Sequence, residues 1–555
     1  SFSLSDDISG NVNSLLPGDF NLDGREDLGM VPFESRYPIR FRLQQKNGRL
    51  GPEMYIEMPA IKFVDMFEFD GKPGMEIFTL LRRSSRLKIY NLVPGSGSKD
   101  FALYTYPLES GKTEGRDTAV GDVNGDGRSD IVVTNPSSSS LSLFIQLKKE
   151  IVHLEDFPTL TEGGEAALGD VMGDEKKEVV VLSAKEKTLA FSGYEDGHIG
   201  FPETIHLEGK PVCFTLVPGK KKSIIAAAVE KDGKVRIVTL VPDQGKFRSE
   251  IGAELSGEPV RFAVVYADKN NRPDLLVFFP YKPPALYLNR DGKYIAAEIR
   301  GEVQEGMLKN ITPQNVFSIF DKPLGRNRMM IARNNYVRSL QWTDDKGLEV
   351  TFQVNSIRKD GRIVSCILSD FSRGPGRELI MLNENASKLE IYEKDGKTGI
   401  FKWVRDMDIP GFQNPVLQSD DFNADGRLDL MIAGKRKFTL VLSNTENIGI
   451  RECYSYQAEN KDAVPFILTC GDMNGDGEKD VVLVEIRNKF IQILAPEDGR
   501  LIKKLAFRVY EKKHYQTQKG RFSAQPREIA AGDLNADGLD DIIILVHDKM
   551  IVYRQ

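Results

Sequence analysis

Residues 121–133 read GDVNGDGRSDIVV. Oxygen-bearing side chains occupy alternate positions at Asp122, Asn124 and Asp126, a glycine follows, and Asp130 precedes an apolar run. This spacing predicts a loop that curls around a hard cation, because calcium takes roughly six to eight oxygen ligands at about 2.3–2.6 Å. The glycine lets the backbone turn back with positive φ. We expect the carboxylate of Asp130 to close the cage, and the residue after it to begin a buried strand.

Four further copies keep the same spacing. A single loop of this kind is compatible with an ordinary polar turn, whereas five copies with identical spacing predict five calcium sites. The expected ligands are Asp19, Asn21, Asp23, Asp27, Asp122, Asn124, Asp126, Asp130, Asp421, Asn423, Asp425, Asp429, Asp472, Asn474, Asp476, Asp480, Asp533, Asn535, Asp537 and Asp541.

Altered copies of the loop fill the intervals between the intact ones. They lie at residues 68–76, 170–178, 217–223, 268–274, 321–328 and 370–378. Together the copies start at 19, 68, 122, 170, 217, 268, 321, 370, 421, 472 and 533, so a unit of about fifty residues repeats eleven times. A period in this range indicates a propeller, a solenoid or an array. Because no composition break interrupts the period, we predict a single repeat domain over residues 1–555.

Each repeat contains four short segments of strand-like pattern. In residues 117–160 the segments are 117–123, 130–134, 141–147 and 151–157. They are joined by turns and show no helical periodicity, which predicts one four-stranded antiparallel blade. Radial packing of such blades protects the sheet edges. The predicted fold is therefore an all-β propeller of about eleven blades.

The two ends of the chain predict how the ring closes. The last repeat stops at its third strand, residues 550–554, and residues 2–4 precede the first blade at the distance expected of a fourth strand. We therefore expect residues 1–6 to complete the last blade. Eleven blades exceed the usual roughly four to eight, so two fused smaller propellers are the alternative.

The loops and blades resemble the FG-GAP/VCBS-type calcium-loop β-propeller family, which includes the integrin α-subunit head and many bacterial surface and secreted proteins. The resemblance covers all eleven repeats and rests on the five DxNxDGxxD loops, while the FG and GAP signatures are mostly absent. It implies that the calcium loops join the first and second strands of each blade on one face. It also implies that ligands meet the opposite face.

Composition narrows the class of protein. The net charge of −6 argues against nucleic acid as the main partner, and no apolar run reaches the length of a membrane helix. The four cysteines lack metal-site spacing and are expected to be buried free thiols. Short separate calcium loops usually bind in the extracellular range of about 10⁻⁴–10⁻³ M. We therefore expect an extracytoplasmic location: periplasm, cell surface or medium.

The turns between the second and third strands are the candidate ligand site. Ten of these eleven turns contain Lys or Arg, and several have aromatic or amide neighbours. A basic rim suits an anionic ligand, although polar turns also collect solvated cations. An inserted loop at residues 510–525 adds further candidates. The predicted ligand-binding residues are Arg36, Tyr37, Arg82, Arg83, Tyr281, Lys282, Asn334, Tyr336, Lys435, Arg436, Lys437, Arg487, His514 and Tyr515.

Catalytic motifs are missing: the sequence has no HExxH, no GxSxG and no phosphate loop. We therefore predict a non-catalytic, calcium-stabilised recognition propeller that binds a partner protein or an anionic polysaccharide. One alternative is a structural ring or scaffold subunit of a membrane-associated cell-envelope assembly. Another is a calcium-dependent polysaccharide lyase, because fold alone does not decide activity.

Overall fold

The structure is a computed structural model of the chain. It describes residues 12, 14–32, 37–56, 58–82, 84, 86–93, 101–108, 115–147, 150–219, 222–243, 246–321, 325–371, 378–443, 449–459, 463–485, 489–509, 526–546 and 549–555. These residues form antiparallel sheets, one α-helix, α1 (Gly301–Leu308), and one 3₁₀ turn, η1 (Pro313–Asn315). The all-β prediction is confirmed, and the helix is an element that the sequence pattern did not indicate. No described helix has the length and apolarity to cross a membrane.

The chain divides into two compact units. Unit 1 contains the described residues from Thr105 to Ser443, and unit 2 contains those before Thr105 and after Ser443. In most sheets of both units the strands follow one another in chain order, and we name the first strand A and the last D.

The described strands of unit 1 form seven groups of four hydrogen-bonded strands, six of them separate sheets and the seventh part of an eight-stranded sheet, and we number these groups sheet 1 to sheet 7. Sheet 1 is β9 (Thr118–Gly121), β10 (Asp130–Asn135), β11 (Ser140–Leu147) and β12 (Glu150–Pro158). Sheet 2 is β13 (Ala166–Gly169), β14 (Glu178–Ser183), β15 (Thr188–Ser192) and β18 (Glu203–Thr204), with a small hairpin of β16 (Tyr194–Glu195) and β17 (His198–Ile199) before β18. Sheet 3 is β19 (Lys210–Pro218), β20 (Ser223–Lys231), β21 (Lys234–Asp243) and β22 (Lys246–Glu254).

The remaining sheets of unit 1 repeat this plan. Sheet 4 is β23 (Arg261–Val265), β24 (Asp274–Phe279), β25 (Lys282–Arg290) and β26 (Lys293–Ala296). Sheet 5 is β27 (Val316–Asp321), β28 (Arg326–Arg333), β29 (Tyr336–Thr343) and β30 (Gly347–Asn355). Sheet 6 is β31 (Ile363–Ser369), β32 (Glu378–Asn383), β33 (Lys388–Lys394) and β34 (Phe401–Asp408). Sheet 7 is β35 (Val416–Asp420), β36 (Asp429–Ala433), β37 (Lys437–Ser443) and β8 (Phe101–Pro107).

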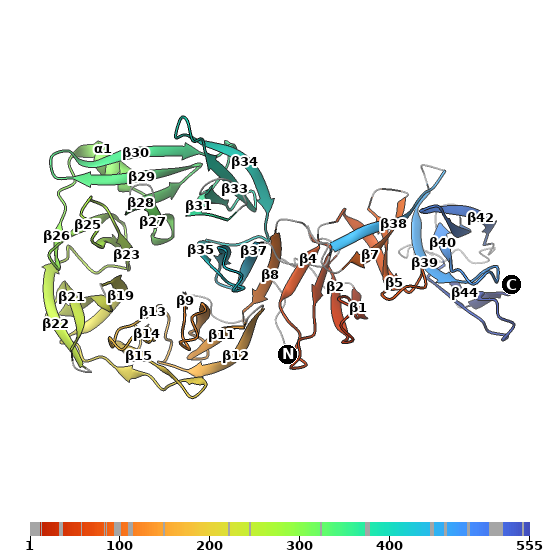
Figure 1. The fold of residues 1–555 in the computed structure, drawn as a ribbon, viewed down its shortest axis with the longest axis horizontal. Helices are drawn as coiled ribbons and strands as arrows, with labels where there is room; N and C mark the ends of the chain where they lie inside the picture. Colours follow the sequence, from red (N-terminus) through yellow and green to blue (C-terminus); the bar gives the residue numbers. More distant parts are fainter. Residues whose placement is uncertain are drawn as a thin grey trace, which may run out of the picture. The chain divides into compact units, whose positions relative to one another are not determined.

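These seven sheets lie around a common centre, with the A strands innermost (Figure 1). The second strand of each sheet is buried on both faces because its apolar side chains pack against both neighbouring sheets. One cluster, for example, joins Leu276 and Leu286 of sheet 4 to Met329 and Leu340 of sheet 5. The hydrophobic core of unit 1 is thus divided into layers between adjacent sheets, as in a propeller.

Strand β8 supplies strand D of sheet 7, although it precedes sheet 1 in the chain. The backbone N–H of Leu108 donates to the carbonyl oxygen of Arg436 at 2.8 Å, and the hydroxyls of Thr105 and Thr439 lie 2.7 Å apart. The ring of Tyr106 stacks on Phe438 with centroids 4.7 Å apart. The first segment of unit 1 therefore completes its last sheet.

The described strands of unit 2 form four groups, which we number sheets 8 to 11, and sheets 9 and 10 are joined edge to edge into one eight-stranded sheet. Sheet 8 is β1 (Ser14–Gly18), β2 (Asp27–Val31), β3 (Ile39–Arg42) and β4 (Glu53–Ile56). Sheet 9 is β5 (Ile61–Phe67), β6 (Glu76–Leu81), β7 (Arg86–Val93) and β38 (Gly449–Gln457). Sheet 10 is β39 (Pro465–Gly471), β40 (Asp480–Glu485), β41 (Phe490–Glu497) and β42 (Arg500–Arg508). Sheet 11 is β43 (Glu528–Gly532), β44 (Asp541–Val546) and β45 (Lys549–Tyr553).

Two repeats have exchanged their D strands. In chain order β8 follows β7 and β38 follows β37, yet β8 completes sheet 7 and β38 completes sheet 9. Strand β38 pairs antiparallel with β7 from Gly449 opposite Val93 to Gln457 opposite Arg86. Lys88 of β7 forms an ion pair with Glu452 of β38 at 2.6 Å. Unit 1 is therefore inserted into unit 2 at the turn between strands C and D of sheet 9.

This arrangement corrects the prediction of one continuous ring over residues 1–555. The strand exchange divides the repeats between two units, which is closer to the alternative of two bodies. The predicted closure by residues 1–6 and the inserted loop at 510–525 lie outside the described residues. All four cysteines are free thiols, as predicted.

Candidate functional site

The loops between strands A and B hold the predicted calcium ligands. In loop 19–27, Asp19 Oδ1 and Oδ2 accept the backbone N–H groups of Asp23 and Gly24 at 3.0 and 2.7 Å. The amide of Asn21 donates to Asp23 Oδ2 at 2.8 Å. The same pattern recurs at 122–130, 421–429 and 533–541, and loop 472–480 shares most of it. The first, third and fifth residues thus present the oxygen donors that a hard cation prefers.

The ninth carboxylate of each intact loop accepts hydrogen bonds from the backbone. The two oxygens of Asp27 accept backbone N–H groups from Phe20 at 2.9 Å and from Gln44 at 2.7 Å. Asp130 does the same with Val123 and Gln146 at 3.0 and 2.9 Å. This carboxylate therefore ties the loop to the end of strand C. Among the described residues, no group of three or more Asp, Glu, His or Cys side chains is arranged around a metal position.

Four of the six altered loops, 68–76, 170–178, 268–274 and 370–378, keep this last carboxylate even where other acids are lost. Asp274 accepts the N–H groups of Ala267 and Asn289 at 2.9 and 2.7 Å, and Glu76 accepts that of Phe69 at 2.8 Å. Burial raises the pKa of Glu76 to about 7 and that of Asp274 to about 6. A carboxylate that accepts hydrogen bonds from two segments of backbone stabilises the loop even without a cation. This explains why it is retained where the other acids of the motif are lost.

The opposite face of unit 1 carries the B–C turns and the connectors from strand D to the next strand A, because strands alternate in direction within each sheet. We call it the turn face. Its predicted basic rim is largely neutralised by ion pairs and carbonyl contacts. Lys185 pairs with Glu162 at 3.2 Å, and Lys231 with Glu208 at 2.9 Å. Lys282 donates to the carbonyl of Ser256 at 3.3 Å.

The predicted ligand residues do not form one patch. Tyr37 is buried against Tyr55, with ring centroids 5.0 Å apart, and Lys437 is 1% exposed with its ammonium 5.0 Å from the ring centroid of Phe412. Both lie at strand ends that point inward, so neither belongs to a solvated rim. The side chains exposed to solvent are Arg82, Tyr281, Lys282, Asn334, Lys435 and Arg436, and Tyr336 is half-buried. Arg36, Arg83, Arg487, His514 and Tyr515 lie outside the described residues.

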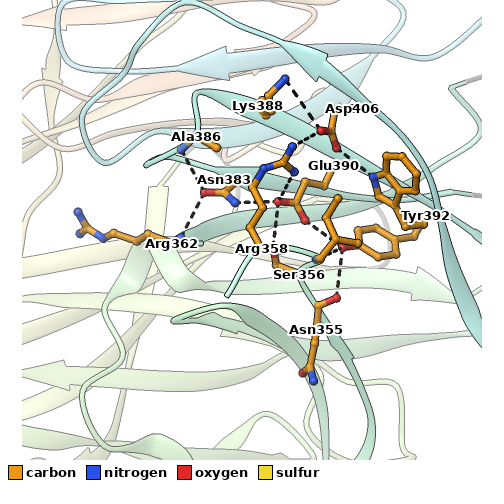
Figure 2. Close-up of polar contacts among 12 residues, drawn as sticks. Asn355, Ser356, Arg358, Arg362, Asn383, Ala386, Lys388, Glu390, Tyr392 and Asp406 are labelled. Carbon is orange, nitrogen blue, oxygen red and sulfur yellow. Dashed lines mark hydrogen bonds and ion pairs between the residues drawn. The ribbon is translucent and has the colours of Figure 1, made fainter. Parts of the chain in front are cut away.

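A buried polar network on sheet 6 anchors one connector of the turn face (Figure 2). Glu390, which is fully buried, accepts hydrogen bonds from Ser356 Oγ at 2.9 Å and from the amide of Asn383 at 2.7 Å. Its carboxylate also lies 3.3 Å from the guanidinium of Arg358 and 2.9 Å from the hydroxyl of Tyr392. Connector residues 356–362 are thereby fixed to strands C and D of sheet 6.

The network continues to the surface at Trp403. Asp406 pairs with Arg358 and accepts the indole N–H of Trp403 at 3.0 Å (Figure 2). Burial works against the charged form of Asp406, but the hydrogen bonds from Arg358 and Trp403 outweigh it and hold its pKa below the ordinary value. Sheet 1 has a related chain from Asn135 through Ser142 to Asp156, with hydrogen bonds of 2.6 Å each. Such chains make the turn face a rigid platform.

Large apolar side chains are exposed on the turn face over neighbouring sheets. Val260 precedes sheet 4, Tyr281 sits in its B–C turn, Val303 lies on α1 before sheet 5, and Ile357 precedes sheet 6. Tyr281 is fully exposed, and the others are 56%, 77% and 48% exposed. We call these four residues the apolar arc. An open pocket of about 470 Å³ lies beside it, between the B–C turn of sheet 3 and residues 254–258.

Sequence reasoning found Tyr281 but missed the other members of the apolar arc and the Glu390 network. The network had no local signal because its residues are far apart in the sequence. The connector between β26 and β27, which contains α1, is longer than the others of unit 1 and is the sequence signal that could have indicated the arc.

The comparisons with known proteins bear on the repeats. Residues 115–143, which include β9, the loop at 122–130 and β10, match the model of the FG-GAP repeat. The chain carries an FG-GAP repeat. FG-GAP repeats are β-propeller blade repeats, so the predicted resemblance is confirmed. No curated protein sequence matches the chain.

Solved structures show only a distant likeness to this chain. BBS1N, in a crystal structure of its complex with ARL6DN, has 14% identity and a TM-score of 0.41, covering 63% of this chain and 99% of that chain. A protein from Lactobacillus plantarum has 14% identity and a TM-score of 0.30, covering 61% and 94%. A protein from Bacteroides uniformis, provisionally named a 6-phosphogluconolactonase, has 13% identity and a TM-score of 0.34, covering 62% and 95%.

Proposed function

We propose that unit 1 is a non-catalytic recognition propeller that binds a partner protein through the apolar arc on its turn face. This proposal rests on the contrast between the paired cations and the exposed apolar side chains of the turn face. Many of its cations are engaged by carboxylates or carbonyls, while Tyr281 and Val303 are exposed. Exposed apolar clusters rimmed by polar groups mark protein interaction sites, and a rigid scaffold lowers the entropy that binding costs.

The proposal is tested by replacing Tyr281 and Val303 together with glutamate. Affinity purification from the source cells, quantified by mass spectrometry, should enrich a partner with the wild-type chain and lose it with the double variant by at least tenfold. The matched control is Phe201→Glu, which changes an apolar side chain that is 78% exposed in sheet 2, in the C–D segment away from the turn face. Equal enrichment by all three proteins would contradict the proposal.

An anionic polysaccharide is the competing ligand class. Lys435 and Arg436 are exposed neighbours in the B–C turn of sheet 7. If a polysaccharide were the ligand, Lys435→Glu with Arg436→Glu would abolish its binding on a glycan array. We expect these changes to leave the binding of the protein partner within about threefold, because the apolar arc lies on other sheets.

We further propose that the five intact loops bind calcium through their first, third and fifth residues, and that the protein works outside the cytoplasm, where calcium is abundant. The oxygen donors in loop 19–27 and its four counterparts support this proposal. The carboxylates of an empty loop repel one another. A chelator should therefore lower the melting temperature by several degrees and increase amide exchange first at residues 472–480 and 533–541, where no arginine occupies the seventh position.

In loops 19–27 and 122–130 the seventh residue is Arg25 or Arg128, and each pairs with the carboxylate of the fifth residue. This internal cation should make both loops less sensitive to chelation. Equal amide exchange with and without chelator in all five loops would contradict calcium binding.

A further inference from the structure

Charged side chains from distant repeats meet at the centre of the turn face of unit 1. Arg261 begins β23 in sheet 4, whereas Asp117 and Glu165 lie just before β9 of sheet 1 and β13 of sheet 2. The guanidinium NH2 of Arg261 lies 2.6 Å from Asp117 Oδ2, and its Nε lies 3.5 Å from Glu165 Oε1. One cation therefore serves two carboxylates that reach it from other sheets.

This contact joins side chains from three sheets that lie around a common centre (Figure 1). Sheets 1, 2 and 4 are not all neighbours in the ring, so the hydrophobic layers between adjacent sheets do not connect them directly. Arg261 makes this direct link. The side chains of Arg261, Asp117 and Glu165 are 38%, 19% and 17% exposed, so the group is shielded but reachable by water.

We propose that Arg261, Asp117 and Glu165 form a pH-sensitive tie across the centre of unit 1. When Glu165 carries a proton, Arg261 and Asp117 make a balanced pair. When Glu165 loses the proton, two carboxylates compete for one guanidinium and the shielded group carries an excess negative charge, which loosens the centre of the turn face.

The groups that face Glu165 from neighbouring strands and connectors fit this assignment. On strand β19 of sheet 3 the backbone N–H of Phe214 donates to Glu165 Oε2 at 3.2 Å. The adjacent thiol of Cys213 is neutral, because burial and the carboxylate of Glu165 raise its pKa well above the usual value. Burial, opposed by Arg261 and supported by Asp117, raises the pKa of Glu165 to about 7. Glu258 adds a further negative charge near Cys213.

The sign of the pH effect follows from linkage. A carboxyl whose pKa is higher in the folded than in the unfolded chain stabilises the fold fully below its ordinary value of about 4.5, and this contribution is lost as the pH rises through about 7. Between pH 5 and pH 8 the unfolding equilibrium should therefore shift by up to about 70-fold on account of Glu165.

The experiment compares Glu165→Gln with the wild-type chain by thermal and denaturant unfolding at pH 5 and pH 8, following amide exchange in β9, β13 and β23. Glutamine resembles the protonated acid, so the two proteins should behave alike at pH 5, and the variant should be more stable at pH 8. The matched control is Glu162→Gln in the same connector, whose partner is the surface residue Lys185. It should show no pH-dependent difference.

A second variant keeps the test decisive if glutamine itself disturbs the site. Arg261→Met removes the shared cation and should move the titration of Glu165 to higher pH, seen by carboxyl-selective infrared spectroscopy. A stability difference between Glu165→Gln and wild type that is the same at both pH values would overturn the proposal. An unchanged Glu165 titration in Arg261→Met would overturn it as well.

Discussion

Replacing Glu53 with alanine is expected to lower the free energy of unfolding of unit 2 by about 3–5 kcal/mol. Glu53 lies on β4 and its carboxylate pairs with Arg40 at 3.2 Å and Arg42 at 3.0 Å on the neighbouring strand β3. The side chains of Glu53 and Arg40 are fully buried, and Arg42 is 5% exposed. Glu53→Ala would remove the carboxylate that pairs with both guanidinium groups at a site where all three side chains are buried.

The measurement is denaturant unfolding, followed by amide exchange in β1 to β4. The informative control replaces the whole cluster with apolar residues: Arg40→Met, Arg42→Leu and Glu53→Leu. Buried ion pairs replaced in this way often cost little, so the triple variant should be more stable than the single one. If Glu53→Ala stayed within 1 kcal/mol of wild type, the cluster would have to be hydrated rather than buried.

The second large effect concerns the strand that completes sheet 7. We expect residues 101–443, produced alone, to fold and unfold cooperatively, whereas residues 109–443 should aggregate. Strand β8 buries Tyr106 against Phe438 and places the N–H of Leu108 on the carbonyl of Arg436. Without it, β37 has an exposed hydrophobic edge, which promotes association between chains.

Calorimetry and size-exclusion chromatography distinguish the two fragments. A milder variant, Tyr106→Ala in the full chain, should cost about 3–5 kcal/mol, because deletion of a large buried aromatic leaves a cavity. Tyr104, which lies on the same strand but packs in unit 2 with Met54 and Ile56, provides the control for an effect confined to unit 1. A fragment 109–443 that remained monomeric and melted like 101–443 would show that β8 is dispensable.

The strands themselves could be predicted from the sequence. Segments expected at 130–134, 141–147 and 151–157 correspond to β10 (Asp130–Asn135), β11 (Ser140–Leu147) and β12 (Glu150–Pro158). Alternating apolar residues and repeated turn motifs are local signals, and local signals decide where strands begin and end. The loop motif also placed the A–B turns correctly, because its glycines and acids specify a turn with or without a cation.

The strand exchange could not be predicted in this way. Strands β8 and β38 follow β7 and β37 at ordinary intervals, so the spacing of the repeats is undisturbed. The sequence of either strand does not indicate which C strand it pairs with, because pairing depends on contacts between residues far apart in the chain. The single-ring prediction failed at this point and nowhere earlier.

The ligand-binding residues predicted for the turn face were only partly correct, again because side-chain contacts depend on residues far apart in the chain. A lysine in a turn is usually solvated, but Lys437 begins β37 and turns inward toward Phe412. Lys185 and Lys231 are on the surface, yet each meets an acid from the connector that precedes its sheet. The positive charges of these lysines could be read from the sequence, but the acidic residues that pair with them could be identified only from the folded structure.

The exchanged strands also determine the order in which the sheets can be completed while the chain is synthesised on the ribosome. The partners Val93 of β7 and Gly449 of β38 are 356 positions apart, so sheet 9 has no fourth strand until the whole of unit 1 has been made. At roughly 5–20 residues per second, this delay lasts about 20 to 70 s. Unit 1 can fold during that interval from contiguous sequence, whereas β7 keeps an open edge throughout. Unit 1 should therefore be complete first, and sheet 9, whose first three strands precede unit 1 in the chain, should be among the last to assemble.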